Sequence, residues 1–253
     1  MRVLLAEDND AIRDLMQEMI GKRSHTVDAV VNGLEALKAV QAKVYDVVVM
    51  DMHMPVMDGC EATHLIRALD GPHSKIPIVA LTAGLTESQR ATYVAAGVDQ
   101  IVAKPAHWPT LFKAIETRGQ TAPDEAVQAG NAPPPPVAAL NYAALNDLGS
   151  VIGEASLARL LDSFRDGLNE DGEKLEAAVQ AEDLKAARRT GHRLKGTCRQ
   201  FGALELAEIG AAIEAATGLD DVARRMAEIT PARTRLAAAL AARAQSALQD
   251  APG

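Results

Sequence analysis

Residues 46–59 read DVVVMDMHMPVMDG, and this stretch decides the fold of the first half of the chain. Its apolar run at residues 46–50 predicts a strand that is buried on both faces, as the strands of parallel sheets are. Similar short apolar runs predict four more strands, at residues 3–6, 26–30, 78–81 and 101–103. Between the strands, helical periodicity predicts helices at residues 11–22, 33–42, 60–69, 87–96 and 110–117.

Strands that alternate with helices predict a parallel sheet with helices on both of its faces. Over residues 1–119 the five strand and helix units predict an α/β, flavodoxin-like doubly wound domain with five parallel strands. Such domains bind their ligands beyond the carboxyl ends of the strands, so the residues directly after each strand are candidates for a site.

The second half of the chain is organised differently. Residues 120–139 lack periodicity and include four prolines at 133–136, which predicts a stiff Pro-rich linker. Residues 140–247 are rich in Ala and Leu and show no strand signal, which predicts an all-α antiparallel helical bundle followed by a tail at 248–253. The predicted joints between its helices are Gly149, Gly153, Asp183, Gly218 and Pro231.

Composition limits the classes of function. The chain has 253 residues and is 48% hydrophobic, which is enough for two domains with cores of their own. A formal net charge of -8 and a pI near 5.3 argue against a nucleic-acid binder. Cys60 and Cys198 lie far apart without metal or disulfide spacing, and the apolar run at the N-terminus is too short for a signal peptide or a membrane span. We therefore expect a cytoplasmic protein with no membrane partner.

Charged and polar residues stand at the ends of four predicted strands. Glu7 and Asp8 follow the first and Asp51 follows the third, so three carboxylates converge at one edge of the sheet. Two like charges about 5 Å apart repel by roughly 3 kcal/mol at an effective dielectric near 20, and a bound Mg²⁺ removes that cost. The Thr82 hydroxyl can donate to a phosphoryl oxygen, and the Lys104 ammonium supplies positive charge. The set predicts Asp51 as a nucleophile that accepts a phosphoryl group.

Each of these residues alone also has an ordinary structural interpretation. Asp8 fits a helix cap, Thr82 a plain strand end, and Lys104 a solvated charge. Their joint occurrence at strand ends, in this order, favours a site. His53 and His64 have no partner at zinc spacing, so we expect no histidine metal site.

These motifs resemble the response-regulator receiver family, over about residues 1–119. The matching stretches are LLAEDN at 4–9, MDMHMPVMDG at 50–59, LTA at 81–83 and AKP at 103–105, and the second is similar to receivers of hybrid kinases. The resemblance implies that Asp51 is the phosphoacceptor and that Mg²⁺ is held by Glu7, Asp8, Asp51 and the backbone carbonyl of His53. One departure is Ile101, because many receivers carry at this position an aromatic residue whose rotation signals phosphorylation.

A second candidate site lies on a helix predicted to begin at the N-cap Asp183 and to run to about Phe201. Its core face is predicted from residues at steps of three and four, namely Ala187, Gly191, Leu194, Cys198 and Phe201. His192 lies beside that face, within a stripe of four cations, Lys185, Arg188, Lys195 and Arg199. Four cations disfavour a protonated imidazole and favour a bound anion.

Gly196 lies one turn after His192, and a glycine inside a helix costs about 1 kcal/mol relative to alanine. Two explanations are open from this helix alone. Either the missing side chain gives another protein access to an exposed His192, or the glycine packs against a second helix.

The run GHRLKG at 191–196 resembles the histidine-containing phosphotransfer domain, together with FGA at 201–203, Leu206, LLDSF at 160–164 and AIE at 212–214. The resemblance covers about residues 140–245. It implies that His192 is a phosphoacceptor, that Lys195 assists the phosphate and that Gly196 gives access. Gly191 stands where such domains often have Ala, and we expect it to loosen the helix.

Two such sites on one chain predict phosphorelay signal transduction. A partner sensor histidine kinase would donate a phosphoryl group to Asp51, and His192 would pass it to the aspartate of a downstream response-regulator receiver. No Gly-rich nucleotide loop or Walker lysine motif is present, so we expect Mg²⁺-dependent self-phosphorylation of Asp51 from a phosphodonor and no kinase activity with ATP. Transfer within one chain and between chains both remain open.

Three rival interpretations remain. The chain could act as a phosphate sink or adaptor that binds partners without forward transfer. A hydrolase of the aspartyl-phosphate class would need a second Asp two residues after Asp51, where His53 stands. The chain could also be the C-terminal part of a hybrid histidine kinase, although a first strand that begins close to Met1 argues mildly against this.

Overall fold

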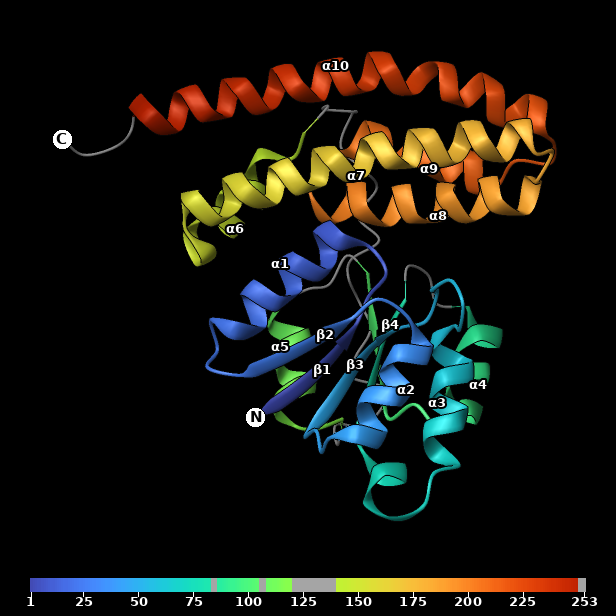
Figure 1. The fold of residues 1–253 in the computed structure, drawn as a ribbon. Coiled ribbons are helices and arrows are strands. Elements are labelled where there is room, and N and C mark those ends of the chain that lie inside the picture. Colours follow the sequence, from blue (N-terminus) through green and yellow to red (C-terminus); the bar gives the residue numbers. More distant parts are fainter. Residues whose placement is uncertain (83–85, 105–107, 120–139, 250–253) are drawn as a thin grey trace. The chain divides into compact units, whose positions relative to one another are not determined.

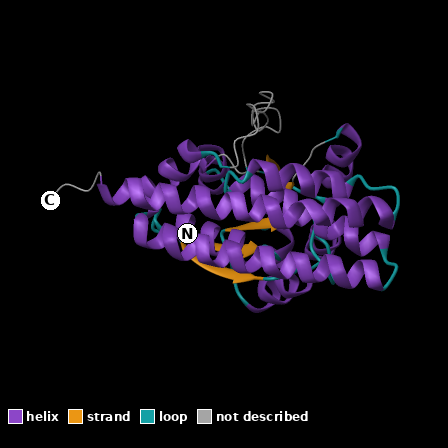
Figure 2. Cartoon of the chain, turned by 90° about the horizontal axis from the view of Figure 1, so that it is seen from above, coloured by secondary structure: helices purple, strands orange, loops and turns teal. Residues whose placement is uncertain are grey.

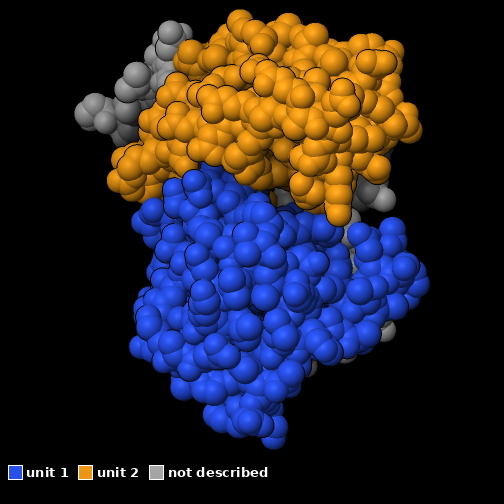
Figure 3. Space-filling model, turned by 45° about the vertical axis from the view of Figure 1, so that its right-hand side comes forward, with its two compact units in different colours: residues 1–131 blue, residues 132–253 orange. Residues whose placement is uncertain are grey.

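The chain forms two compact units, residues 1–131 and 132–253 (Figure 3). The computed structural model describes residues 1–82, 86–104, 108–119 and 140–249. The predicted linker at 120–139 and residues 250–253 of the predicted tail lie outside the described residues. Within the described ranges, all strands (orange in Figure 2) belong to the first unit, and the second unit contains helices.

Five parallel strands form one sheet in the first unit, in the order β2-β1-β3-β4-β5. The strands are β1 (Arg2–Ala6), β2 (Thr26–Val30), β3 (Val47–Asp51), β4 (Ile78–Thr82) and β5 (Gln100–Ala103). Every residue of β3 and β4 is buried, because helices cover both faces of the sheet. The five strand predictions are confirmed to within one residue at each end.

Helices cover the sheet on both sides, with α1 and α5 on one face and α2, α3 and α4 on the other (Figure 1). They are α1 (Asp10–Gly21), α2 (Gly33–Ala42), α3 (Gly59–Arg67), α4 (Glu87–Ala96) and α5 (Trp108–Glu116), with a short 3₁₀ helix η1 (Gly71–Lys75). Side chains cap the first four of these helices, from Asn9, Asn32, Asp58 and Thr86. The predicted doubly wound fold is confirmed, and the helix bounds agree to within two residues.

The second unit is a bundle of α6 (Tyr142–Ile152), α7 (Glu154–Gln180), α8 (Leu184–Gln200), α9 (Leu204–Glu214) and α10 (Leu219–Gln249). Its core includes the stacked rings of Phe164 and Phe201, whose centroids are 4.6 Å apart. Asp183 is the N-cap of α8, and its side chain accepts a hydrogen bond from the Ala186 N–H. The predicted all-α bundle is confirmed.

Two of the predicted joints are wrong. Gly149 lies inside α6, where a Cβ would come within 2.5 Å of the Glu154 carboxylate, so this glycine allows close packing and does not end the helix. Pro231 lies inside α10, although an internal proline costs about 3 kcal/mol. Ile229, Ala232 and Leu236 are buried on the same stretch, and their packing explains why the helix continues.

Val56, in the loop between β3 and α3, combines a φ of 72° with an exposed side chain. A left-handed backbone costs a β-branched residue roughly 1–2 kcal/mol, whereas Asn tolerates it. We therefore expect Val56→Asn to raise the free energy of unfolding of the first unit by about 1 kcal/mol, measured by denaturant titration.

The matched control is Val44→Asn, since Val44 is also exposed but does not have a positive φ. That change should alter stability by no more than about 0.5 kcal/mol. Equal effects of the two substitutions would show that the Val56 backbone stores no strain.

Candidate functional site

The register of the sheet brings four of the predicted residues to neighbouring strand ends. The pairs at the carboxyl edge are Ala6 with Met50, Asp51 with Leu81, and Thr82 with Ala103. Glu7 and Lys104 each follow the strand residue of such a pair, and the Lys104 N–H donates to the Thr82 carbonyl across 2.7 Å. These residues therefore lie at one edge of the sheet, as their positions after the strands predicted.

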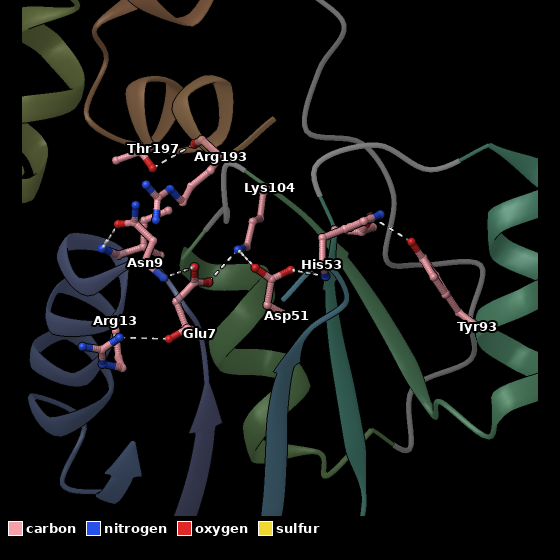
Figure 4. Close-up of polar contacts among 11 residues, drawn as sticks. Glu7, Asn9, Arg13, Asp51, His53, Tyr93, Lys104, Arg193 and Thr197 are labelled. Atoms are coloured by element: carbon pink, nitrogen blue, oxygen red, sulfur yellow. Dashed lines mark hydrogen bonds and ion pairs between the residues drawn. The ribbon is translucent and has the colours of Figure 1, made fainter. Parts of the chain in front are cut away.

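Lys104 lies between two carboxylates at this edge (Figure 4). Its Nζ is 2.6 Å from Glu7 Oε2 and 2.8 Å from Asp51 Oδ2. The other Asp51 oxygen accepts a hydrogen bond of 3.0 Å from the His53 N–H. Glu7 and Asp51 are buried, and these contacts compensate the cost of burying their charges.

Burial shifts the titration of this cluster. It raises the pKa of Glu7; the Lys104 ammonium lowers that pKa, and the charges of Asp51 and Asp8 raise it further. Burial alone would lower the pKa of Lys104, but the Asp51 and Glu7 carboxylates raise it overall, so Lys104 stays charged. The carboxylates of Glu7, Asp8 and Asp51 thus outnumber the Lys104 ammonium that pairs with two of them.

Three carboxylates can hold a metal ion here. Oxygen atoms of Glu7, Asp8 and Asp51 all lie within 4.8 Å of one another. Opposite ligands of an octahedral Mg²⁺ are separated by about 4.2 Å, so this spacing fits the ion after a small contraction or with a bridging water. Asn9, and not Asp8, caps α1, so the capping interpretation of Asp8 is wrong.

The second cluster lies in the helical unit, where α9 brings a carboxylate to the predicted histidine. Glu214 Oε1 is 2.7 Å from His192 Nδ1, and Glu214 Oε2 is 2.5 Å from Lys195 Nζ. Arg188 donates to the Glu214 carbonyl across 2.8 Å. The His192 side chain is 24% exposed, less open than predicted, because Glu214 lies against it.

Glu214 contacts both His192 and Lys195, and no role was predicted for it from the sequence. It stands 22 positions after His192, on another helix, so no spacing within α8 could reveal it. The hydrogen bond with His192 lowers the pKa of Glu214 to about 2; burial opposes this shift and Lys195 adds to it. Its charge also corrects the prediction that cations alone surround His192.

Two glycines set the distance between α8 and α9. A Cβ on Gly191 would lie 2.7 Å from the Glu214 nitrogen, and one on Gly210 would lie 2.6 Å from the Lys195 nitrogen. Gly191 therefore does not simply loosen its helix, as predicted, since it lets the two backbones touch and brings Glu214 to His192. A Cβ on Gly196 would have no neighbour within 4 Å, which removes the packing explanation for that glycine among the described residues.

Alanine substitutions at Gly191 and at Gly196 should change the stability of the helical unit in opposite directions. Gly191→Ala should lower the stability of the helical unit by about 1–3 kcal/mol, because the new methyl group meets backbone atoms that cannot turn away. Gly196→Ala should raise the stability by about 1 kcal/mol, because it gains helix propensity in open space. Thermal unfolding of the two variants checks both signs, and a stabilised Gly191→Ala variant would contradict the close approach.

Two family models match this chain. Residues 3–116 match the response regulator receiver domain, and residues 159–250 match the Hpt domain. Within the described ranges, none of the helices combines the length and the apolar character that crossing a bilayer requires.

Several of the related proteins are sensor kinases. Sensor histidine kinase AruS of Pseudomonas aeruginosa is 30% identical over 207 residues, which cover 81% of this chain and 20% of the kinase. Sensor protein GacS of Pseudomonas syringae pv. syringae is 32% identical over 216 residues, covering 81% of this chain and 23% of that protein. The chain thus spans about a fifth of the length of these relatives.

Among solved structures, a receiver domain of a sensor histidine kinase from Pseudomonas aeruginosa PAO1, described with a magnesium ion in its active site cleft, is 30% identical. It covers 47% of this chain and 98% of its own, with a TM-score of 0.44. The two family matches and the acidic and histidine clusters lead to one conclusion: the chain belongs to the two-component signalling proteins, with a response regulator receiver domain followed by an Hpt domain.

Proposed function

We propose that this chain is an intermediate of a phosphorelay, which accepts a phosphoryl group on Asp51 and passes it on through His192. The observation that carries the proposal is the presence of both clusters on one chain. One is an acidic pocket with a buried ammonium beside Asp51, and the other is a partly exposed imidazole held by a carboxylate. The receiver domain is taken as residues 1–119 and the Hpt domain as residues 140–247.

In the receiving step, an Asp51 oxygen attacks the phosphorus of a phosphohistidine on a partner sensor kinase. A P–O bond forms, the P–N bond breaks, and the donor imidazole leaves with the electron pair and takes up a proton. The Lys104 ammonium stabilises the negative charge that develops on the phosphoryl oxygens. The Thr82 hydroxyl donates a hydrogen bond to one of these oxygens. Mg²⁺, held by Glu7, Asp8, Asp51 and the His53 carbonyl, would neutralise charge on the phosphoryl group when bound.

In the forward step, His192 Nε2 attacks the aspartyl phosphate, so a P–N bond forms and the P–O bond to Asp51 breaks. Glu214 accepts the Nδ1–H hydrogen bond, which assigns the lone pair to Nε2. The ring gains positive charge as the bond forms, and the ionised Glu214 carboxylate stabilises it. A downstream receiver aspartate then takes the group from His192.

The test uses a histidine-kinase donor with Mg²⁺ and the variants Asp51→Asn and His192→Gln. Intact mass and the stability of the phosphate in acid and base distinguish phosphoaspartate from phosphohistidine. We expect the wild type to gain an acid-labile phosphate that both variants lose, because His192 is loaded through Asp51.

A different result would identify the sink or adaptor. In that case His192→Gln keeps its aspartyl phosphate and the wild type never acquires phosphohistidine. If Asp51→Asn is phosphorylated on His192 directly by the kinase, the proposed order of transfer is wrong.

A further inference from the structure

Helix α4 contributes one buried side chain to its unit. Tyr93 is the single buried residue in Glu87–Ala96, a helix that the structure describes in full, and it is 4% exposed. The ring belongs to the same buried cluster as Ile101, whereas its neighbour Val94 is 53% exposed. The position of α4 therefore depends strongly on what Tyr93 contacts.

The Tyr93 hydroxyl contacts the residue proposed to bind the phosphoryl group. Its oxygen lies 3.4 Å from Thr82 Oγ1, and Thr82 is fully buried. In Figure 4 the Tyr93 side chain extends from α4 toward the pocket that holds Asp51. Hydroxyl hydrogen bonds are normally about 2.5–3.0 Å long, so this one is weak.

A stronger acceptor would draw Thr82 away from Tyr93. Either hydroxyl can be the donor of the bond between Thr82 and Tyr93. A bond from Thr82 to an anionic phosphoryl oxygen is about twice as strong as a bond between neutral groups, and turning the side chain to reach that oxygen moves Oγ1 away from Tyr93, whichever hydroxyl donates. Burial raises the pKa of Tyr93, which keeps its phenol protonated and leaves it as a neutral partner. The bond between Thr82 and Tyr93 is thus the one that phosphorylation would break.

The carboxyl end of α4 is held independently of Tyr93. Arg67 on α3 donates to the Gly97 carbonyl across 2.9 Å and to the Asp99 carboxylate across 2.7 Å. Gly97, with a φ of 98°, is the C-cap of α4. One end of the helix is therefore fixed, while its middle is held by the ring.

We propose that Tyr93 carries phosphorylation of Asp51 to α4. When Thr82 turns to the phosphoryl group, the Tyr93 hydroxyl loses its contact and α4 loosens about its fixed carboxyl end. Tyr93 then does from α4 what Ile101, which has no polar atom, cannot do from β5. A protein partner that docks on α4 would thereby distinguish the two states. The inference rests on the proposed acceptance of phosphate at Asp51.

The experiment measures hydrogen exchange of the peptide over residues 87–96 in the full chain, with Mg²⁺ and acetyl phosphate as donor. Every chain compared carries His192→Gln, so that the phosphate counted by mass stays on Asp51, and the wild type below is the chain with this change alone. Intact mass of the same sample gives the phosphorylated fraction. We expect phosphorylation of the wild type to speed exchange in α4 by roughly 2- to 10-fold, the factor that corresponds to one neutral hydrogen bond. Tyr93→Phe, which keeps the ring, should exchange faster by a similar factor before phosphorylation and respond little to it.

Tyr45→Phe is the matched control, since the Tyr45 hydroxyl bonds Asp28 and not Thr82. It should respond to phosphorylation as the wild type does. The inference is overturned if intact mass shows phosphate on Asp51 while α4 exchange stays constant, or if Tyr93→Phe responds fully. If no phosphate appears by mass, the proposed function fails first and this inference falls with it.

Discussion

A Lys104→Met variant will accept phosphate on Asp51 about 10²- to 10³-fold more slowly than the wild type, the loss typical when one preorganised donor is removed from a site of developing charge. The Lys104 side chain is 9% exposed and its Nζ is 2.8 Å from Asp51 Oδ2. Water therefore screens its charge weakly, and no other cation contacts Asp51 among the described residues. Methionine keeps the length of the side chain and removes the charge.

The measurement is the time course of phosphate gain by intact mass, with Mg²⁺ and a small phosphodonor in excess. Lys43→Met is the control, because it makes the same change in an exposed pair with Asp28 in the same unit. Its rate should equal that of the wild type. A folded Lys104→Met variant that accepts phosphate within about 3-fold of the wild type would contradict the role given to Lys104.

An Arg193→Ala variant will lose about 3–5 kcal/mol of stability in the helical unit, because it leaves a buried carboxylate without its partner. Asp171 on α7 is 2% exposed and pairs with Arg193 on α8. Neither the core pattern of α7 nor that of α8 predicts this charge inside the bundle. Hydrogen exchange of the α7 and α8 amides reports the local free energy of opening without interference from the first unit.

Breaking an exposed ion pair in the same bundle is the control that shows how much of the loss comes from burial of the charge. Arg165→Ala breaks an exposed ion pair with Asp162 on the same helix and should cost no more than about 1 kcal/mol. The double change Asp171→Leu with Arg193→Met should recover most of the loss, since an apolar pair can replace a buried ion pair. An Arg193→Ala effect as small as that of Arg165→Ala would show that water reaches Asp171.

The elements with strong local signals were predictable. Apolar runs such as that before Asp51 bury both faces of a strand, and this requirement fixes the sheet from sequence alone. The carboxyl edge of a parallel sheet then brings Glu7, Asp51 and Lys104 together without knowledge of any side-chain contact. The N-cap at Asp183 was equally predictable, because an N-cap side chain bonds a backbone N–H within the next three residues.

What could not be predicted depends on contacts between distant residues. Pro231 stops a helix by local rules, yet the burial of Ile229 and Leu236 keeps α10 continuous. Glu214 reaches His192 only because two glycines let α8 and α9 touch. The contact between Tyr93 and Thr82 likewise joins α4 to β4 across the pocket and leaves no trace in either sequence pattern.

The backbone contact at Gly191 and Gly210 bears on how much rotational entropy His192 would lose in phosphoryl transfer. Backbone atoms are the nearest neighbours of both glycines across this joint, so main-chain geometry limits how closely α8 and α9 can approach. Glu214 therefore fixes the His192 ring while the domain folds, and little rotational freedom is left to lose when an aspartate approaches. In the proposed relay, a phosphoaspartate would then meet a nucleophile that is already aligned, even in a brief encounter.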